Sequence, residues 1–134
     1  MTYLLDTNTC IQYLRGKNPE VLRRISAHPA ANISVCSIVV AELEYGATRS
    51  ANPVRELAKV ASFLSAYRSF AYDDAAASLY VRYRVALEAR GLMIGHFDLM
   101  IAAVALVNGL TLVTHNTGEF SRVLGLTLED WEVP

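Results

Sequence analysis

The sequence predicts an α/β protein, a three-layer α/β/α sandwich around a central, mostly parallel sheet of four to five short strands. Short apolar runs alternate with segments of helical periodicity, which is the pattern of βαβ units. Residues that start and end helices separate these segments. A chain of 134 residues with 53% hydrophobic residues is long enough for one buried core. We therefore expect a single domain over residues 1–134.

The first half of the chain predicts two strands, each followed by helices. Asn18 and Asn52 each precede a proline, the combination of N-cap and first helical residue. Gly16 follows a segment with helical spacing of apolar residues and predicts its end. Ser37 is the expected cap of the helix after the second strand. The predicted elements are a strand at 3–5, helices at 7–15 and 19–27, a strand at 33–36, and helices that begin after Ser37 and at Pro53.

The second half continues the alternation and contains the most apolar helix. Asp73 is an N-cap, and Gly91 ends the helix that follows it. Residues 98–108 are too continuously apolar for a surface helix, so this helix should be nearly enclosed. The predicted elements are a strand at 70–72, helices at 74–90 and 98–108, a strand at 110–114, a short helix at 119–124 and an edge strand at 127–128.

Composition excludes several classes of protein. A net charge of −1 and a mean hydropathy of +0.27 do not fit a disordered chain. The longest strongly apolar run, Leu99–Val107, is far shorter than a membrane span. The N-terminal residues lack a basic region, and Cys10 and Cys36 form no CxxC motif, so we expect a cytoplasmic protein without a signal peptide. Residues 15–90 carry a surplus of four positive charges and residues 91–134 a surplus of four negative ones, which permits a basic flank beside an acidic centre.

Four carboxylates are the candidate chemical groups. Asp6 ends the first strand, Glu42 lies on the helix after the second, Asp98 begins the enclosed helix, and Glu119 follows the last buried strand. Parallel sheets place their sites at the carboxyl ends of the strands, where such acids would require a cation, and Mg²⁺ or Mn²⁺ prefers these hard oxygen ligands. Taken singly, each acid also has a structural explanation as a helix cap, a helix-dipole partner or a solvated residue.

Four segments together resemble a known family. They are LLDTN at 4–8, AELEYGA at 41–47, FDLMIAA at 97–103 and LVTHNTGEF at 112–120, followed by LEDW at 128–131. In this order and spacing they resemble PIN-domain proteins, and more narrowly the VapC ribonuclease toxins of bacterial type II toxin–antitoxin pairs. These motifs are most similar to those of the VapC enzymes that cleave initiator tRNA, tRNA(fMet), in the anticodon region.

The resemblance implies a Mg²⁺- or Mn²⁺-dependent endoribonuclease that inhibits translation and leaves 5′-phosphate and 3′-hydroxyl ends. It assigns metal binding to Asp6, Asp98 and Glu42, and catalysis to these three and Glu119. Many PIN domains carry an aspartate where this chain has Asn116, so Glu119 is the better candidate for the fourth acid. The residues expected to orient the carboxylates are Thr7, Asn8, Ser37, Thr114 and Asn116.

The expected partners are an RNA substrate, a VapB-like antitoxin and a second copy of the chain, within a larger toxin–antitoxin assembly. Arg15, Lys17 and His96 are candidate substrate contacts. Two interpretations are open for His96 and equally for His115: a group that contacts RNA or transfers a proton, or an ordinary loop histidine. Apolar side chains beyond what a core needs predict interaction surfaces on the helices after Pro53 and after Asp73.

Two other functions remain open at this point. A haloacid-dehalogenase-type phosphohydrolase would use Asp6 as a nucleophile, but it needs a second aspartate at position 8, where Asn8 stands, and a lysine after Lys59, where the chain has none. A non-catalytic PIN-like interaction protein would explain Asn116 as the trace of a lost metal site.

Overall fold

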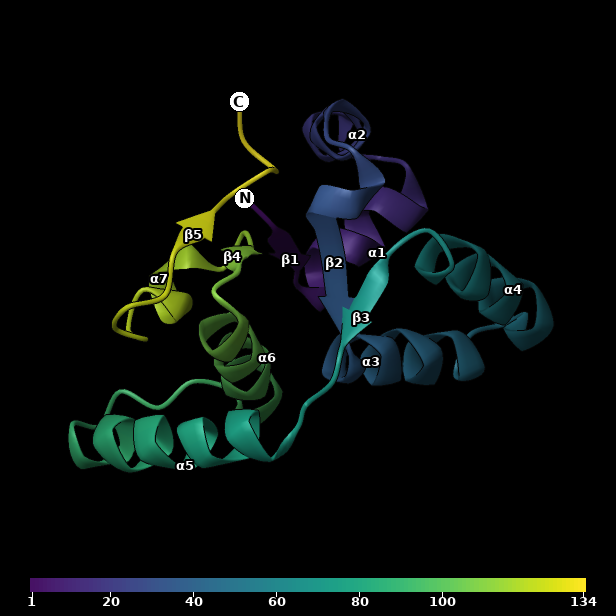
Figure 1. Cartoon of the computed structure of the whole chain (residues 1–134). Helices are drawn as coiled ribbons and strands as arrows, with labels where there is room; N and C mark the ends of the chain where they lie inside the picture. Colours follow the sequence, from purple (N-terminus) through teal and green to yellow (C-terminus); the bar gives the residue numbers. More distant parts are fainter.

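The computed structural model describes residues 1–134 and contains one parallel sheet with helices on both faces (Figure 1). The elements in chain order are β1 (Tyr3–Leu5), α1 (Thr7–Arg15), α2 (Pro19–Ala27), a 3₁₀ turn (Ala30–Asn32), β2 (Ile33–Cys36), α3 (Ser37–Thr48), α4 (Pro53–Leu64), β3 (Arg68–Phe70), α5 (Asp74–Ala89), α6 (His96–Asn108), β4 (Thr111–Val113), α7 (Thr117–Phe120) and β5 (Leu128–Glu129).

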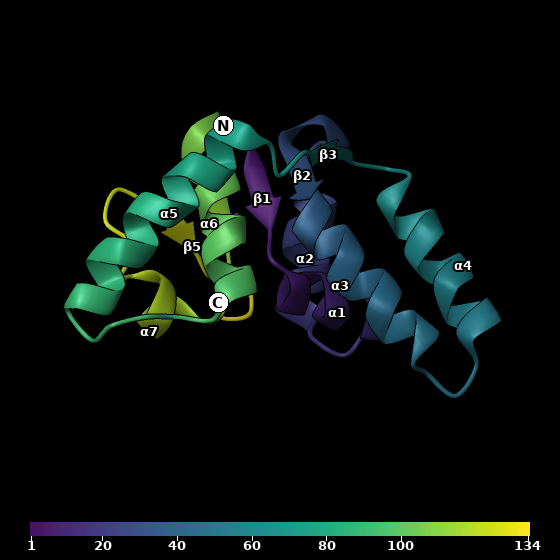
Figure 2. The same ribbon diagram turned by 90° about the horizontal axis from the view of Figure 1, so that it is seen from below.

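The strand order is β3-β2-β1-β4-β5, and every neighbouring pair is parallel. The chain moves outward from β1 to β3 and then returns across the sheet to β4. Right-handed crossovers therefore place α1–α4 on one face and α5–α7 on the other. In Figure 2 the two groups of helices lie on opposite sides of β1. This arrangement confirms the predicted α/β/α sandwich, with five strands.

Local signals account for most of the helix boundaries. The side chains of Asn18, Asn52 and Asp73 each accept a hydrogen bond from a backbone N–H three residues later, as N-caps do. Gly16 follows α1 in the left-handed conformation, with φ of 65°, and its N–H closes the last turn. Ser37 is not the cap of α3: Cys36 occupies that position, and Ser37 is the first helical residue.

Several boundaries differ from the prediction: α6 begins at His96 rather than at residue 98, and β4 spans Thr111–Val113 rather than 110–114. The third strand lies at Arg68–Phe70 rather than 70–72, and the last strand is displaced by one residue to Leu128–Glu129. The last helix begins at Thr117 and ends at Phe120, whereas the sequence predicted 119–124. Short elements at sheet edges carry too few periodic positions to fix their ends, which pairing with the neighbouring strand decides instead.

The core lies against both faces of the sheet. Helix α6 is the most enclosed, with Leu99 and residues 101–105 all buried, as its continuous apolar sequence predicts. The buried Trp131 closes the core at the C-terminal end and packs against Tyr3 and His28, with ring centroids 5.0 Å from each. None of the helices is both long enough and apolar enough to cross a membrane.

Candidate functional site

The site lies at the point where the strand order of the sheet reverses, between β1 and its neighbour β4. The helix after β1 covers one face and the helix after β4 covers the other, so a crevice opens beyond the carboxyl ends of these strands. Asp6 directly follows β1, and Thr114 directly follows β4. The register pairs Leu5 with Val113, so the two polar residues lie at the same edge.

Asp6 is the buried centre of this edge, with 4% of its surface exposed. Its Oδ1 accepts a hydrogen bond of 2.8 Å from the backbone N–H of Thr9, so Asp6 is also the N-cap of α1. Burial raises the pKa of the Asp6 carboxyl, and hydrogen bonds from Thr114 and Thr9 oppose that rise. A single side chain thus holds the start of α1 and presents a carboxylate to the crevice.

Glu42 reaches the site from α3 and is held by α1. The Thr7 hydroxyl donates a hydrogen bond of 2.6 Å to Glu42 Oε1 across 35 residues of sequence. This contact fits the predicted orienting role of Thr7. Glu42 is half-buried, so its carboxylate remains accessible from the crevice.

Asp98 lies in the first turn of α6 and is the most perturbed acid of the site. Its pKa is raised to about 6, first by burial and then by the negative charges of Asp6, Glu42 and Glu119. The other three predicted acids therefore lie close enough to Asp98 to disfavour its charge. Gly95 lies so near that a Cβ there would be 3.3 Å from Asp98 Oδ2.

Glu119 lies on α7 at the outer side of this group. The Asn116 side-chain amide donates a hydrogen bond of 2.9 Å to Glu119 Oε2. The backbone N–H of Asn116 in turn donates to the Thr114 hydroxyl, at 3.0 Å. Asn116 supplies no charge, but it orients the acid that does, and Thr114 links it to Asp6.

Two residues predicted to orient the carboxylates do not contact them. Asn8 is exposed on the first turn of α1 and makes no hydrogen bond to an acid of the site; Thr9 makes that contact with Asp6. The Ser37 hydroxyl accepts a hydrogen bond from the backbone N–H of Tyr72, so it supports the segment after β3. The resemblance implied an orienting role for both residues, but the turn of each helix directs their side chains elsewhere.

The donor set suits a hard divalent cation, although the side chains are not gathered into a finished coordination shell. The three candidate ligands, Asp6, Glu42 and Asp98, are all carboxylates, and the charges of the neighbouring acids add to burial in raising the pKa of Asp98. No group of three or more histidine, cysteine, aspartate or glutamate side chains converges closely enough to hold one ion. A bound cation would relieve the repulsion among these carboxylates.

The predicted substrate contacts occupy different places. His96 begins α6, two residues before Asp98, and its Nδ1 lies 2.8 Å from the Tyr80 hydroxyl, which also accepts a hydrogen bond from Arg84. Arg15 and Lys17 lie at the far end of α1, about 12 Å along the helix from its start. The His96 ring thus contacts Tyr80 of α5 and no acid of the site, and Lys17 lies beyond the far end of α1.

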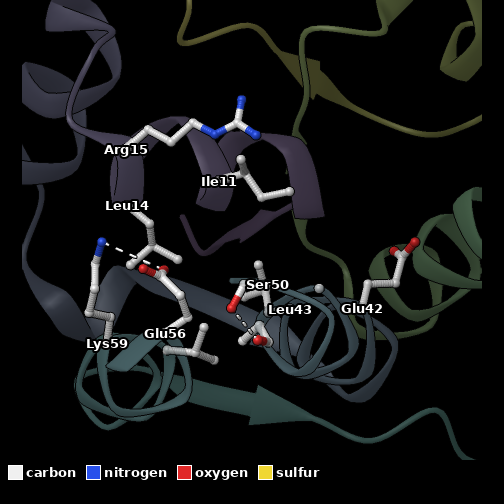
Figure 3. Close-up of a pocket in the computed structure, with 11 residues that line it drawn as sticks. Ile11, Leu14, Arg15, Glu42, Leu43, Ser50, Glu56 and Lys59 are labelled. Carbon is white, nitrogen blue, oxygen red and sulfur yellow. Dashed lines mark hydrogen bonds and ion pairs between the residues drawn. The ribbon is translucent and has the colours of Figure 1, made fainter. Parts of the chain in front are cut away.

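A groove extends from the site between α1, α3 and α4 (Figure 3). It has a volume of about 220 Å³ and includes Glu42 at one end. Charged side chains border it, among them Arg15 and the Lys59–Glu56 ion pair of 3.7 Å. Its floor is apolar and includes Leu14 and Leu43. The groove thus joins an acidic end to an apolar trough.

Sequence reasoning missed two contributors to the site. Thr9 binds Asp6 by its backbone N–H and the Val113 carbonyl by its hydroxyl. Asp130, on the segment after β5, raises the pKa of Asp6 and forms an ion pair with His115. An aspartate at the N-cap position predicts a hydrogen bond from the backbone N–H three residues later, which is the signal that identifies Thr9. No local signal identifies Asp130, because 124 positions separate it from Asp6.

Comparisons with known proteins agree on one family. The sequence model of the PIN-domain family matches residues 3–126 of this chain. The chain is 40% identical to the tRNA(fMet)-specific endonuclease VapC of Shigella flexneri over 131 residues, 98% of each protein, and 38% identical to Ribonuclease VapC2 of Rickettsia felis, covering 98% of this chain and 99% of that protein.

Solved structures give the same result for the fold. A crystal structure of VapBC from Salmonella typhimurium bound to DNA has a chain that superposes with a TM-score of 0.92 at 37% identity, covering 98% of both chains. VapBC2 from Rickettsia felis, bound to a DNA fragment from its promoter, contains a chain with a TM-score of 0.91 at 35% identity, covering 98% of this chain and 99% of that one.

Proposed function

This chain belongs to the PIN-domain family, among the VapC ribonuclease toxins of toxin–antitoxin pairs, and from that premise we propose that it is a Mg²⁺- or Mn²⁺-dependent endonuclease of tRNA. The single observation that carries the proposal is the electrostatic coupling of Asp98 to Asp6, Glu42 and Glu119 at one edge of the sheet. The relatives named above cleave RNA, and the Shigella flexneri enzyme is specific for tRNA(fMet). We propose initiator tRNA as the substrate of this chain too.

Asp6, Asp98 and Glu42 would hold the cation. When bound, a divalent ion lowers the pKa of an attacking water and stabilises the negative charge that develops on the phosphate and the leaving oxygen. The protein supplies the positions. Thr9 and Thr114 fix Asp6, and Thr7 fixes Glu42, so neither carboxylate needs to reorganise during the reaction.

Proton transfer falls to the acids at the border of the site. Glu42 is half-buried and held at one oxygen only, by Thr7 at 2.6 Å, so its other oxygen can accept a proton from the attacking water. Attack in line with the 3′ oxygen leaves a 5′-phosphate and a 3′-hydroxyl. Glu119, oriented by Asn116 at 2.9 Å, completes the negative wall on the α7 side.

Cleavage of bulk tRNA tests this function. Wild-type protein, Asp98→Asn and the matched control Glu44→Gln are incubated with tRNA in Mg²⁺, in Mn²⁺ and in chelator, and fragment ends are sequenced. Glu44 is an exposed acid on α3 that makes no ion pair. We expect cleavage by wild type and by the control in either metal ion, and none by Asp98→Asn or in chelator. Cleavage that persists in chelator would contradict the metal mechanism.

The two alternative functions are not favoured. The phosphohydrolase requires an acid at position 8, and Asn8 is an exposed amide that does not contact Asp6. The non-catalytic alternative predicts a decayed site, whereas each of the four acids lies where it acts on Asp98 or is Asp98 itself. Absence of cleavage under every condition in the tRNA experiment would instead support the non-catalytic interaction protein.

The groove between α1, α3 and α4 is our proposed seat for the antitoxin. VapB partners accompany the relatives in their solved structures. An antitoxin segment with apolar side chains fits the floor at Leu14 and Leu43, and a basic side chain at its end fits the acidic end at Glu42. This placement explains inhibition, because the same segment would occupy the groove and neutralise the site.

A second copy of the chain is the proposed partner of α5. Val81 and Val85 lie one turn apart, with 55% and 64% of their surfaces exposed. Contiguous exposed apolar residues on a helix are typical of an interface. Burying both valines against a second copy of the chain would remove apolar surface from water.

A further inference from the structure

His115 lies at the rim of the acidic site, paired with a carboxylate from a distant part of the chain. Its Nδ1 is 3.0 Å from Asp130 Oδ2, and 58% of its side chain is exposed against 18% for Asp130. His115 directly follows Thr114, which binds Asp6. The second ring nitrogen, Nε2, makes no hydrogen bond within the protein. The imidazole therefore has one nitrogen held and the other free for a ligand.

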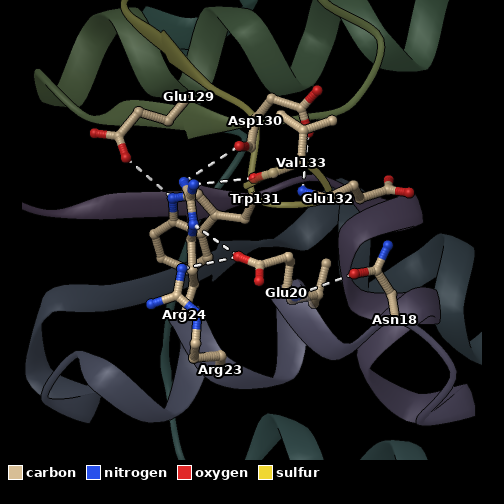
Figure 4. Close-up of polar contacts among 10 residues, drawn as sticks. Asn18, Glu20, Arg23, Arg24, Glu129, Asp130, Trp131, Glu132 and Val133 are labelled. Atoms are coloured by element: carbon tan, nitrogen blue, oxygen red, sulfur yellow. Dashed lines mark hydrogen bonds and ion pairs between the residues drawn. The ribbon is translucent and has the colours of Figure 1, made fainter.

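Asp130 is itself fixed, so it can orient the ring. Its Oδ1 accepts a hydrogen bond of 2.9 Å from the backbone N–H of Glu132, and its backbone carbonyl accepts one of 3.3 Å from Arg24 (Figure 4). Arg24 also binds the Val133 carbonyl at 3.0 Å. Because the carboxylate accepts from Nδ1–H, the ring presents Nε2 outward.

The pair contributes little to stability, which leaves a functional role open. Exposed ion pairs of this kind stabilise a fold only weakly, because solvent screens their charges and both side chains lose rotamer freedom. The strand connection beside it is already secured by the backbone bond of 2.9 Å from Thr114 N–H to the Glu129 carbonyl. A loop that is already tied to β5 gains little more from an exposed ion pair.

The charge of His115 complements a ligand that the site otherwise repels. Three carboxylates face the ring: Asp130 and Glu132 from the C-terminal segment, and Asp6 from the end of β1. They raise the pKa of His115 above 6.5, the hydrogen bond from the ring to Asp130 contributing most. A protonated ring donates a hydrogen bond from Nε2 and attracts a phosphodiester toward acids that would push it away.

We propose that His115, held by Asp130, binds a backbone phosphate of the RNA beside the acidic site. The proposal rests on the ribonuclease function and adds a substrate-binding residue to it. Asp130 is a positioning residue that acts through the ring. The contact places RNA on the side of the site formed by α7 and the C-terminal segment, whereas Arg15 and the antitoxin groove lie on the α1 side.

Steady-state cleavage of bulk tRNA tests this role, with wild type, His115→Ala, His115→Arg and Asp130→Asn. The matched control is Arg55→Ala, which removes an exposed cation whose ion pair lies within α4. At pH 6.5 we expect His115→Ala to raise KM about 3- to 10-fold with kcat within 2-fold of wild type. We expect its dependence of log(kcat/KM) on log salt to become shallower by about one phosphate contact. His115→Arg should restore KM, because the cation is retained.

The pH dependence separates binding from support of the fold. In Asp130→Asn the ring loses its charged partner, so KM should approach that of His115→Ala at pH 8 and that of wild type at pH 6. An unchanged KM in His115→Ala would overturn the inference. An equal rise in KM in His115→Ala and His115→Arg, with melting temperatures equal to wild type, would overturn it too. Either result would leave the ribonuclease function intact. If wild type cleaves no tRNA, the proposed function fails, and this role fails with it.

Discussion

Replacing Asp98 by asparagine should stabilise the metal-free protein while it abolishes cleavage. The folded-state pKa of Asp98 is raised from 3.8 to about 6, because burial and three other carboxylates disfavour its charge. A group whose pKa is higher in the folded state lowers stability as pH rises through the interval between its two pKa values. The cost to the folded protein is thus absent near pH 3.5 and complete above about pH 6.5.

The shift sets the size of the effect. Two pKa units correspond to about 3 kcal/mol at 1.36 kcal/mol per unit. Asp98 is partly exposed, and solvent screening reduces this to about 1–2 kcal/mol. At pH 7.5 in chelator we therefore expect Asp98→Asn to exceed wild type in free energy of unfolding by about 1–2 kcal/mol, and we expect this gap to shrink toward zero near pH 4.

Urea unfolding followed by circular dichroism measures the gap, with Glu44→Gln as the control for loss of an exposed negative charge. Mg²⁺ or Mn²⁺ should stabilise wild type but not Asp98→Asn, since the cation offsets the repulsion only where all the acids are present. A variant no more stable than wild type at pH 7.5, or a gap that does not change with pH, would refute the reasoning that the four acids repel one another.

Three further predictions concern the surroundings of the site. Thr7→Val removes the 2.6 Å hydrogen bond to Glu42 and should lower kcat on tRNA about 10- to 100-fold while the melting temperature stays within a few degrees; a kcat equal to wild type would contradict the orienting role. Gly46→Leu should stabilise α3 by up to about 1 kcal/mol in urea unfolding and fill the groove, since a Cβ at Gly46 meets no atom within 4 Å; we expect its tRNA cleavage to persist when the antitoxin that co-purifies with wild type is added, and normal inhibition would place the antitoxin elsewhere. Val85→Glu should convert a dimer to a monomer in light scattering, because its side chain is 64% exposed on α5; an unchanged mass would exclude this face as the interface.

Local chemistry was enough to predict the order and type of nearly all elements. The caps at Asn18, Asn52 and Asp73 act on backbone groups three residues away, so their effect is written in adjacent residues. The enclosed position of α6 follows from its apolar content alone. The position of Asp6 at the site could also be predicted, because a charged residue that ends a buried strand of a parallel sheet lies at the edge where sites form.

Contacts between distant residues depended on the tertiary structure. The sequence suggested Asn8 and Ser37 as partners of the acids, but Thr9 binds Asp6, and Ser37 binds the backbone of Tyr72. His115 and Asp130 meet only because β5 pairs with β4. The sequence by itself determined which segments become strands and helices and which acids end them, since those choices depend on interactions within a few residues. Which oxygen meets which hydroxyl was decided by packing, because an offset of one residue along a strand or helix turns a side chain to another face.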